Sequence, residues 1–189
     1  MKTIVTALYA EAAPIIKKYR LQKVSDIPFI HYHSDSLELI ISGTGALNCA
    51  VAVSWYLCTK PIPEKLINIG ICASGKKVHK IGNCYGIDKI IDAHSNKVWH
   101  LPSQSTSLLP RADITTYATP QKKISCKTEL IDMESSGFYT AAAKFLQKEK
   151  IKLCKIISDY GTEQIPDPAF IHDLIRRNLP LLEKVLASD

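Results

Sequence analysis

Three short apolar runs constrain the fold of this chain more than any other feature. They are Lys2–Leu8, Leu66–Ile71 and Lys152–Ser158. Because these runs are apolar along most of their length instead of at alternate positions, they are typical of strands buried on both faces. A chain that contains several such strands needs helices on both sides of its sheet.

Helical patterns alternate with these strands. The helices are predicted at Glu11–Arg20, Ala46–Thr59, Glu134–Lys148 and Ala169–Ala187, the last disturbed at Pro180. Further strands are predicted at Phe29–His33, Leu37–Ser42, Cys84–Ala93 and Leu130–Met133. Residues 94–128 give a weak signal, with one strand at Asp113–Ala118, and would hold a substrate-covering loop or irregular structure. The alternation predicts one α/β domain over residues 1–189, with helices on either side of the sheet.

The composition is that of an ordinary globular protein. The chain has 189 residues, of which 46% are hydrophobic and 22% charged, and this size suits one domain. No stretch reaches the ~18 consecutive apolar residues that a membrane helix needs. Met1–Ala10 lacks the apolar core and cleavage site of a signal peptide. We therefore expect neither membrane insertion nor secretion.

The positive charge does not predict a nucleic-acid partner. There are 24 Lys and Arg residues against 18 Asp and Glu, a formal charge of +6. Basic pairs such as Lys17–Lys18, Lys76–Lys77 and Lys122–Lys123 are scattered along the chain. The one dense stretch, residues 144–155, is interpreted as the cationic end of a helix.

Cysteine and histidine spacing predicts no metal site. None of the six cysteines forms a C-x-x-C or other close pair, and most lie in apolar runs such as Val51–Cys58. They are expected to be small hydrophobic residues in a reducing cytoplasm. His31 and His33 share a strand face, but no third ligand is placed to join them.

Candidate chemical groups follow the predicted strands. The groups just beyond a strand are Glu11, Gly43-Thr44-Gly45, the loop at residues 71–76, Met133-Glu134 and Ser158-Asp159. In α/β sheets, ligands bind at the carboxyl ends of the strands. We therefore expect these groups to lie together at one edge of the sheet.

Two of these groups have a binding and a structural interpretation. Backbone amides of the glycine turn could bind an anion, or the turn could need glycine only for positive φ. Glu134 could accept hydrogen bonds from two vicinal hydroxyls, as on a ribose, or could complement the helix dipole. Asp132 competes with Glu134, and one of the two carboxylates must face the other way.

Asp159 and Glu11 also have both a functional and a structural interpretation. Asp159, at the rim of an apolar strand, could be a general acid whose pKa is raised by desolvation. It could equally be a turn aspartate before Gly161. Glu11 has apolar neighbours and no lysine before Lys17, although it could simply favour the start of a helix.

The order of these segments resembles a known family. The segments are Ala-Leu-x-x-Glu-Ala at 7–12, Ser42-Gly43-Thr44-Gly45, Leu66–Gly70, Lys80–Asn83, Asp132-Met133-Glu134-Ser135 and Ile156-Ile157-Ser158-Asp159. The chain resembles the nucleoside phosphorylase superfamily, and within it looks most like methylthioadenosine/adenosylhomocysteine nucleosidases and futalosine hydrolase-type enzymes. The resemblance spans residues 2–187, except for 94–128.

The resemblance implies a fold and an activity. The fold is a three-layer α/β/α arrangement around a mixed sheet. The activity is cleavage by water of the N-glycosidic bond of a purine nucleoside, without a cofactor, in a homodimer. Met133 would lie beneath the sugar and Glu134 would bind its 2′- and 3′-hydroxyls. Asp159, with Ser158 beside it, would protonate N7 of the purine, and Glu11 would position the water.

Departures from the family pattern leave alternatives open. Gly82-Asn83 stands where the family has Gly-Asp, and Ile71–Ser74 replaces a series of small residues. Tyr117 or Phe138 could stack on the base. A phosphorylase would need a phosphate-binding arginine, and Arg111 is the candidate among four arginines. A non-catalytic nucleoside-binding protein is the third alternative.

Overall fold

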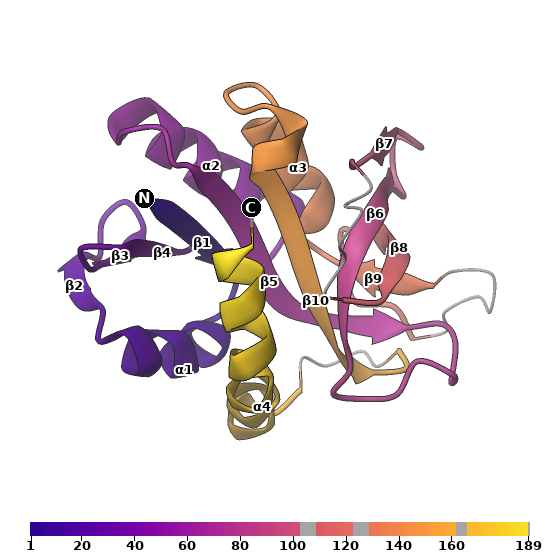
Figure 1. Ribbon diagram of the computed structural model, residues 1–189. Coiled ribbons are helices and arrows are strands. Elements are labelled where there is room, and N and C mark those ends of the chain that lie inside the picture. The colour runs from indigo at the N-terminus through magenta and orange to yellow at the C-terminus, as the bar shows by residue number, and fades with distance from the viewer. Residues whose placement is uncertain (103–108, 123–128, 162–165, 189) are drawn as a thin grey trace.

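The computed structural model describes residues 1–102, 109–122, 129–161 and 166–188. Within these residues, ten strands form one sheet, and helices cover both of its faces (Figure 1). The strands are β1 (Lys2–Thr6), β2 (Gln22–Ser25), β3 (Ile30–His33), β4 (Leu37–Ile41), β5 (Lys65–Ser74), β6 (Cys84–Asp92), β7 (Val98–His100), β8 (Arg111–Thr116), β9 (Leu130–Asp132) and β10 (Ile151–Asp159). The helices are α1 (Tyr9–Tyr19), α2 (Ala46–Thr59), α3 (Ser135–Ala142) and α4 (Pro168–Ala187).

The sheet is mixed, as the resemblance implied. Its centre is parallel, in the order β4, β1, β5 and β10. Antiparallel pairs join β2 to β3, β3 to β4, β5 to β9, β10 to β6 and β6 to β7. Because β10 pairs with both β5 and β6, the strands β5, β9, β8, β6 and β10 form a closed ring. The carboxyl ends of β1, β5 and β10 lie at the same edge of the sheet.

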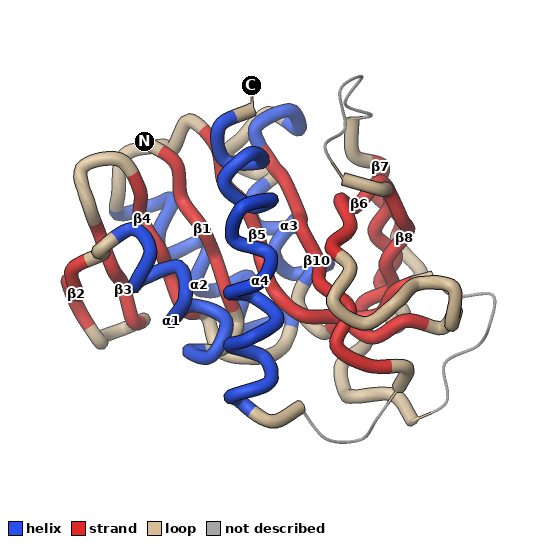
Figure 2. The backbone as a smooth tube through the Cα atoms, turned by 60° about the horizontal axis from the view of Figure 1, so that its bottom comes forward, coloured by secondary structure: helices blue, strands red, loops and turns tan. Residues whose placement is uncertain are grey.

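The helices form two layers, one on each face of the sheet. Figure 2 shows α1 and α4 in front of the strands and α2 and α3 behind them. Neighbouring β1 residues divide between the two hydrophobic cores: Val5 packs with the core of α2 and α3, and Ile4 with that of α1 and α4. This division explains why the central strands are apolar at successive positions. The fold is a three-layer α/β/α arrangement.

Most predicted elements are confirmed, with differences at the edges and ends. The sequence analysis missed β2 and β7, which are short strands with exposed positions at the sheet periphery. β5 continues past Ile71 because Ala73 and Ser74 pair with β9, so most of the loop predicted at residues 71–76 belongs to the strand. α4 continues through Pro180 without a break in its helical assignment.

The third helix is shorter than predicted. α3 ends at Ala142 instead of near Lys148, and a short 3₁₀ turn at Lys148–Lys150 precedes β10. The lysine-rich stretch lies beyond α3, so its interpretation as a helix end is wrong. Leu146 is buried there, but its neighbours are exposed, and the apolar stripe that would hold another helical turn is missing. No helix in the described part of the chain is both long and apolar enough to cross a membrane.

Candidate active site

A pocket opens at the edge where β1, β5 and β10 end. It contains about 650 Å³ of empty space, including its mouth. Six of the predicted site residues line it: Glu11, Thr44, Met133, Glu134, Ser158 and Asp159. Its apolar wall includes Ile71, Ile131 and Pro166, and Thr119–Gln121 lie at the pocket within the region of weak signal. Residues 103–108 and 123–128 of that region are outside the described structure.

Glu11 holds the start of α1 and also lines the pocket. Its carboxylate Oε2 accepts hydrogen bonds of 2.9 Å from the N–H groups of Ala7 and Leu8, which fastens the start of α1. Its Oε1 accepts a third, of 2.8 Å, from the N–H of Ile71 on β5. Burial raises the pKa of Glu11, against the lowering effect of these N–H groups and of Lys155. The carboxylate therefore bridges two strand ends at the pocket wall.

The glycine turn binds an anion, and that anion is a side chain of the protein. The Gly45 N–H donates a 2.8 Å hydrogen bond to Oε1 of Glu134. Gly43 and Gly45 have φ of +79° and +97°, so the turn also needs glycine conformationally. The conformational interpretation of the turn is thus confirmed, and ligand binding by the turn stays a prediction, because neither Gly43 nor Gly45 is in the pocket lining. Of its residues, Thr44 lines the pocket, while Gly45 acts through Glu134.

Asp132 and Glu134 both line the pocket, so the expectation that one of them faces the other way is wrong, but their hydrogen-bond partners differ. Asp132 accepts hydrogen bonds from the Thr116 hydroxyl at 2.9 Å and from the Ser135 N–H at 3.0 Å, and it pairs with Lys155 Nζ at 2.8 Å. The Asp132 carboxylate therefore serves to hold the start of α3. Within the described residues, Oε2 of Glu134 has no hydrogen-bond partner, so this oxygen is available to a ligand in the pocket.

The sequence analysis missed Lys155. This side chain is 1% exposed and lies on β10 among apolar neighbours. Burial lowers its pKa, but the Asp132 and Glu134 carboxylates outweigh that effect, and the pKa of Lys155 is raised. The missed signal is a lysine inside an apolar strand, because a buried ammonium group needs a carboxylate partner. We name Glu11, Asp132, Glu134 and Lys155 the pocket cluster.

The pocket cluster contains more acid than base. Burial and the nearby Asp132 carboxylate raise the pKa of Glu134 to about 7, against the opposing effect of Lys155. One ammonium group thus faces three carboxyl groups. Such a site favours a ligand or a transition state that carries positive charge.

Asp159 ends β10 at the rim of the pocket. Its Oδ2 accepts a 2.7 Å hydrogen bond from the Ser158 hydroxyl, and its Oδ1 accepts one of 2.7 Å from the Gly161 N–H. The second contact is the turn that the structural interpretation predicted. Because the carboxyl group also lines the pocket, the turn sets its orientation without removing it from the site.

Besides Gly43 and Gly45, three candidates from the sequence do not line the pocket in the described structure. Phe138 is fully buried in the core between α2, α3 and the sheet, so it is not a stacking residue. Tyr117 is also absent from the lining, although its N–H bonds to Asp132. Arg111 points elsewhere, where its guanidinium group pairs with Asp88 at 2.5 Å and bonds to the Ile87 carbonyl at 2.7 Å.

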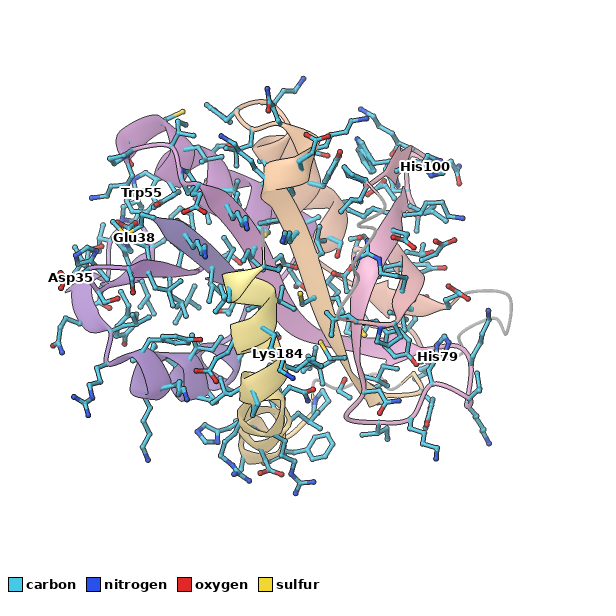
Figure 3. All side chains as sticks on the ribbon, viewed as in Figure 1. Asp35, Glu38, Trp55, His79, His100 and Lys184 are labelled. Carbon is cyan, nitrogen blue, oxygen red and sulfur yellow. The ribbon has the colours of Figure 1, made fainter. Side chains whose placement is uncertain are left out.

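A second buried polar group lies toward the opposite end of β1. Glu38 contacts His31 Nε2 at 3.2 Å and His33 Nδ1 at 3.5 Å, a carboxylate neighbour that the sequence analysis did not find. Figure 3 labels Glu38 and Trp55 on the side of the molecule that carries β3, β4 and α2. We name His31, His33, Glu38 and Tyr56 the His31 cluster. Among the described residues, no group of three or more side chains is arranged to hold a metal ion.

Comparisons with solved structures show that this fold is shared with nucleosidases. A 5′-methylthioadenosine/S-adenosylhomocysteine nucleosidase from Helicobacter pylori matches with a TM-score of 0.81 and 13% identity, over 98% of this chain and 97% of that one. The futalosine hydrolase of Helicobacter pylori gives the same four values. The 5′-methylthioadenosine nucleosidase of Arabidopsis thaliana matches with a TM-score of 0.81 and 16% identity, over 98% and 94% of the two chains. No protein-family model and no curated protein sequence matches the chain.

Proposed function

We propose that this protein hydrolyses the N-glycosidic bond of a purine nucleoside. The observation that carries the proposal is the convergence of Glu11, Glu134 and Asp159 on one pocket at the carboxyl ends of the strands. Three carboxyl groups in three different surroundings can divide the tasks of binding, activating water and donating a proton. The fold shared with nucleosidases and a futalosine hydrolase supports the same reaction class.

Glu134 and Met133 bind the ribose in this proposal. Oε1 of Glu134 is fixed by the Gly45 N–H, and Oε2 accepts hydrogen bonds from the 2′- and 3′-hydroxyls. Met133 lies in the pocket wall next to Glu134 and packs beneath the sugar. A carboxylate fixed at one oxygen loses little conformational freedom on binding, which favours the bound geometry.

Glu11 positions the attacking water. Each carboxylate oxygen has two lone-pair sites, and both sites of Oε2 are occupied by backbone N–H groups. Oε1 has one N–H partner, so its remaining site accepts a hydrogen bond from the water. Burial raises the pKa of Glu11, which makes it a better base than an exposed glutamate.

Asp159 donates the proton to N7 of the departing purine. Ser158 and Gly161 orient its carboxyl group at the rim, where the base would leave. Protonation of N7 makes the purine a better leaving group, and the ribose then develops oxocarbenium character. The excess of carboxyl groups in the pocket cluster stabilises that positive charge.

The pocket favours water over phosphate as the nucleophile. A phosphorylase needs cationic donors for the phosphate, and arginine suits this task best. No arginine or lysine is among the described residues that line the pocket. Lys155 lies behind the wall and is paired with Asp132, while Arg111 pairs with Asp88.

A homodimer is the proposed assembly, and the cytoplasm the proposed compartment. α2 has no charged residue over Ala46–Thr59, and it exposes Leu47 by 77% and Val51 by 51%, one turn apart. A second copy of the chain would cover this apolar face. The free thiols of Cys49 and Cys58 support a reducing compartment. Sedimentation of the wild-type protein and of Leu47→Glu tests the assembly, because the variant should sediment as a monomer.

The proposed activity is tested by purine release from a panel of nucleosides. Methylthioadenosine, adenosylhomocysteine, adenosine, inosine and futalosine are each incubated with and without phosphate, and the free base is measured by chromatography. Release without phosphate is the expected result, and Glu11→Gln should abolish it while retaining nucleoside binding. Release that requires phosphate would make the protein a phosphorylase. Binding of a nucleoside without release would support a non-catalytic protein.

A further inference from the structure

Three glycines of this chain lie in regular secondary structure, where glycine is destabilising relative to alanine. They are Gly70 in β5, Gly86 in β6 and Gly137 in α3. Gly43, Gly45, Gly82 and Gly161 differ, because their positive φ values of +79° to +99° favour glycine. Gly70, Gly86 and Gly137 have no positive φ, so we ask which atoms a side chain at each position would meet.

The space at Gly70 is occupied by the Glu11 carboxylate. A Cβ at Gly70 would lie 2.9 Å from Oε1 of Glu11 and 3.5 Å from its carboxyl carbon. The same oxygen accepts the 2.8 Å hydrogen bond from the N–H of Ile71, the next residue on β5. A methyl group at position 70 would therefore push Oε1 away from that N–H. Because Glu11 is a flexible side chain, the carboxylate would shift while the strand keeps its place.

The space at Gly137 is occupied by the backbone of α2. A Cβ at Gly137 would overlap the carbonyl group of Ala46 and would lie 2.7 Å from its Cα. Gly137 is one turn after Glu134, and Ala46 directly follows Gly45, whose N–H holds Oε1 of Glu134. The close approach of α2 and α3 at this point therefore sets the distance between the Gly45 N–H and the Glu134 carboxylate.

We propose that Gly70 and Gly137 are positioning residues. The absence of a side chain at Gly70 leaves room for the Glu11 carboxylate, and its absence at Gly137 lets α2 and α3 approach closely enough to hold the Glu134 carboxylate. This inference rests on the proposed function, because it assigns the two carboxylates different tasks. Glu11 acts on the water, so its displacement affects turnover. Glu134 holds the ribose, so its displacement affects the affinity for the nucleoside.

The test compares Gly70→Ala and Gly137→Ala in the full chain. Gly70→Ala should lower kcat by about tenfold to hundredfold, since a misplacement of about 1 Å has effects of this size, and should leave KM within about threefold. Gly137→Ala should weaken nucleoside binding by about tenfold or more, as expected for loss of a charged hydrogen bond. It should leave the dissociation constant of the free purine within about twofold, because the free base makes no contact with Glu134.

Gly86→Ala is the matched control. Gly86 is also a strand glycine, and a Cβ there would meet the end of a flexible side chain, the guanidinium group of Arg111. Arg111 does not line the pocket in the described structure. Gly86→Ala should therefore change kcat, KM and purine binding by less than about twofold, whatever it does to thermal stability.

A double-mutant cycle separates positioning from a general loss of structure. In a Glu134→Ala background, Gly137→Ala should not weaken nucleoside binding further, because the carboxylate that it displaces is already gone. Additive losses in the two variants would overturn the inference for Gly137, and an unchanged kcat in Gly70→Ala would overturn it for Gly70. If Gly137→Ala does not fold, Gly70→Ala still decides the inference for β5, where only a side chain has to move. Failure of the wild-type chain to release purine would refute the proposed function instead.

Discussion

The pocket cluster and the His31 cluster both bury titratable side chains, and in the His31 cluster Nδ1 of His31 has no hydrogen-bond partner among the described residues. The described pocket, however, is lined by residues of the pocket cluster and by none of the His31 cluster. In the His31 cluster, the Glu38 carboxylate contacts His31 and His33, and the Tyr56 hydroxyl bonds to Thr3 at 2.8 Å. In the pocket cluster, Glu134 lines a cavity, and its Oε2 has no hydrogen-bond partner among the described residues. A buried polar atom without a partner therefore does not by itself indicate a binding site, whereas a carboxylate in the wall of an open cavity is a candidate for one.

The two clusters also differ in their balance of acid and base. The pocket cluster places three carboxyl groups around one lysine, and burial together with the Asp132 carboxylate raises the pKa of Glu134 to about 7, against the effect of Lys155. The His31 cluster places one carboxylate beside two imidazoles, and burial lowers the pKa of His31 despite that carboxylate. Glu134 in the pocket cluster therefore keeps its proton to a higher pH than an ordinary glutamate, and His31 stays neutral to a lower pH than an ordinary histidine.

Asp159→Asn should reduce turnover by about 10²- to 10⁴-fold, the usual contribution of a general acid. Asparagine has nearly the same shape but carries no transferable proton. The thermal midpoint should change little, because Asp159 lines the pocket and is only partly buried. Steady-state purine release and thermal unfolding measure both effects. A large loss of thermal stability with intact turnover would make Asp159 a turn residue only.

Lys155→Met should lower the free energy of unfolding by about 3–5 kcal/mol, because it leaves the buried Asp132 carboxylate without its cation. Urea titration at pH 7 measures the change. Adding Asp132→Asn to the variant should restore part of the stability, since it removes the uncompensated charge. If Lys155→Met alone has no effect on stability, the ion pair is not what holds the start of α3.

The sequence predicted the ligand-facing side of the pocket but not the charges behind it. Glu11, Glu134 and Asp159 were identifiable because each follows a strand, and strand order alone brings the ends of β1 and β10 together. The burial of Lys155 depends on Asp132, which reaches it from β9 through tertiary packing. The local pattern indicates that Lys155 is buried, but it does not show which carboxylate pairs with it.

Tertiary packing also explains the other differences between the predicted and the observed structure. β2 and β7 are exposed strands held by their pairing partners, so their sequences lack the apolar pattern of the central strands. Phe138, four residues after Glu134, was one of two candidates for stacking on the base. The helix instead directs it into the core with α2, and only the packing of α3 could show this.

Glu134→Gln should remove a pH dependence of stability that the wild-type pocket cluster has. The folded pKa of Glu134 is about 7, above the ordinary value of 4.5, so folding favours the protonated form. Its contribution to stability is fully present below pH 4.5 and is lost as the pH rises through 7. The loss corresponds to roughly 3 kcal/mol. Urea titrations from pH 4.5 to 8 should show the wild-type protein losing stability relative to Glu134→Gln, and parallel curves would contradict the raised pKa.

His31→Gln should have the smallest effect, with the opposite sign. The pKa of His31 is lowered in the folded state, first by burial and then by Lys60 and His33, while Glu38 opposes the shift. Tyr56 and Trp55 also pack against the ring. Folding therefore favours the neutral imidazole, and this cluster loses stability as the pH falls below 6.5. In the same titrations, His31→Gln should lose less stability than the wild-type protein between pH 6.5 and 5. The two clusters respond to pH in opposite directions, so one variant of each shows which cluster causes the loss of stability at high pH and which at low pH. If Glu134→Gln still loses stability above pH 6.5, the pocket cluster is not the cause of the loss at high pH.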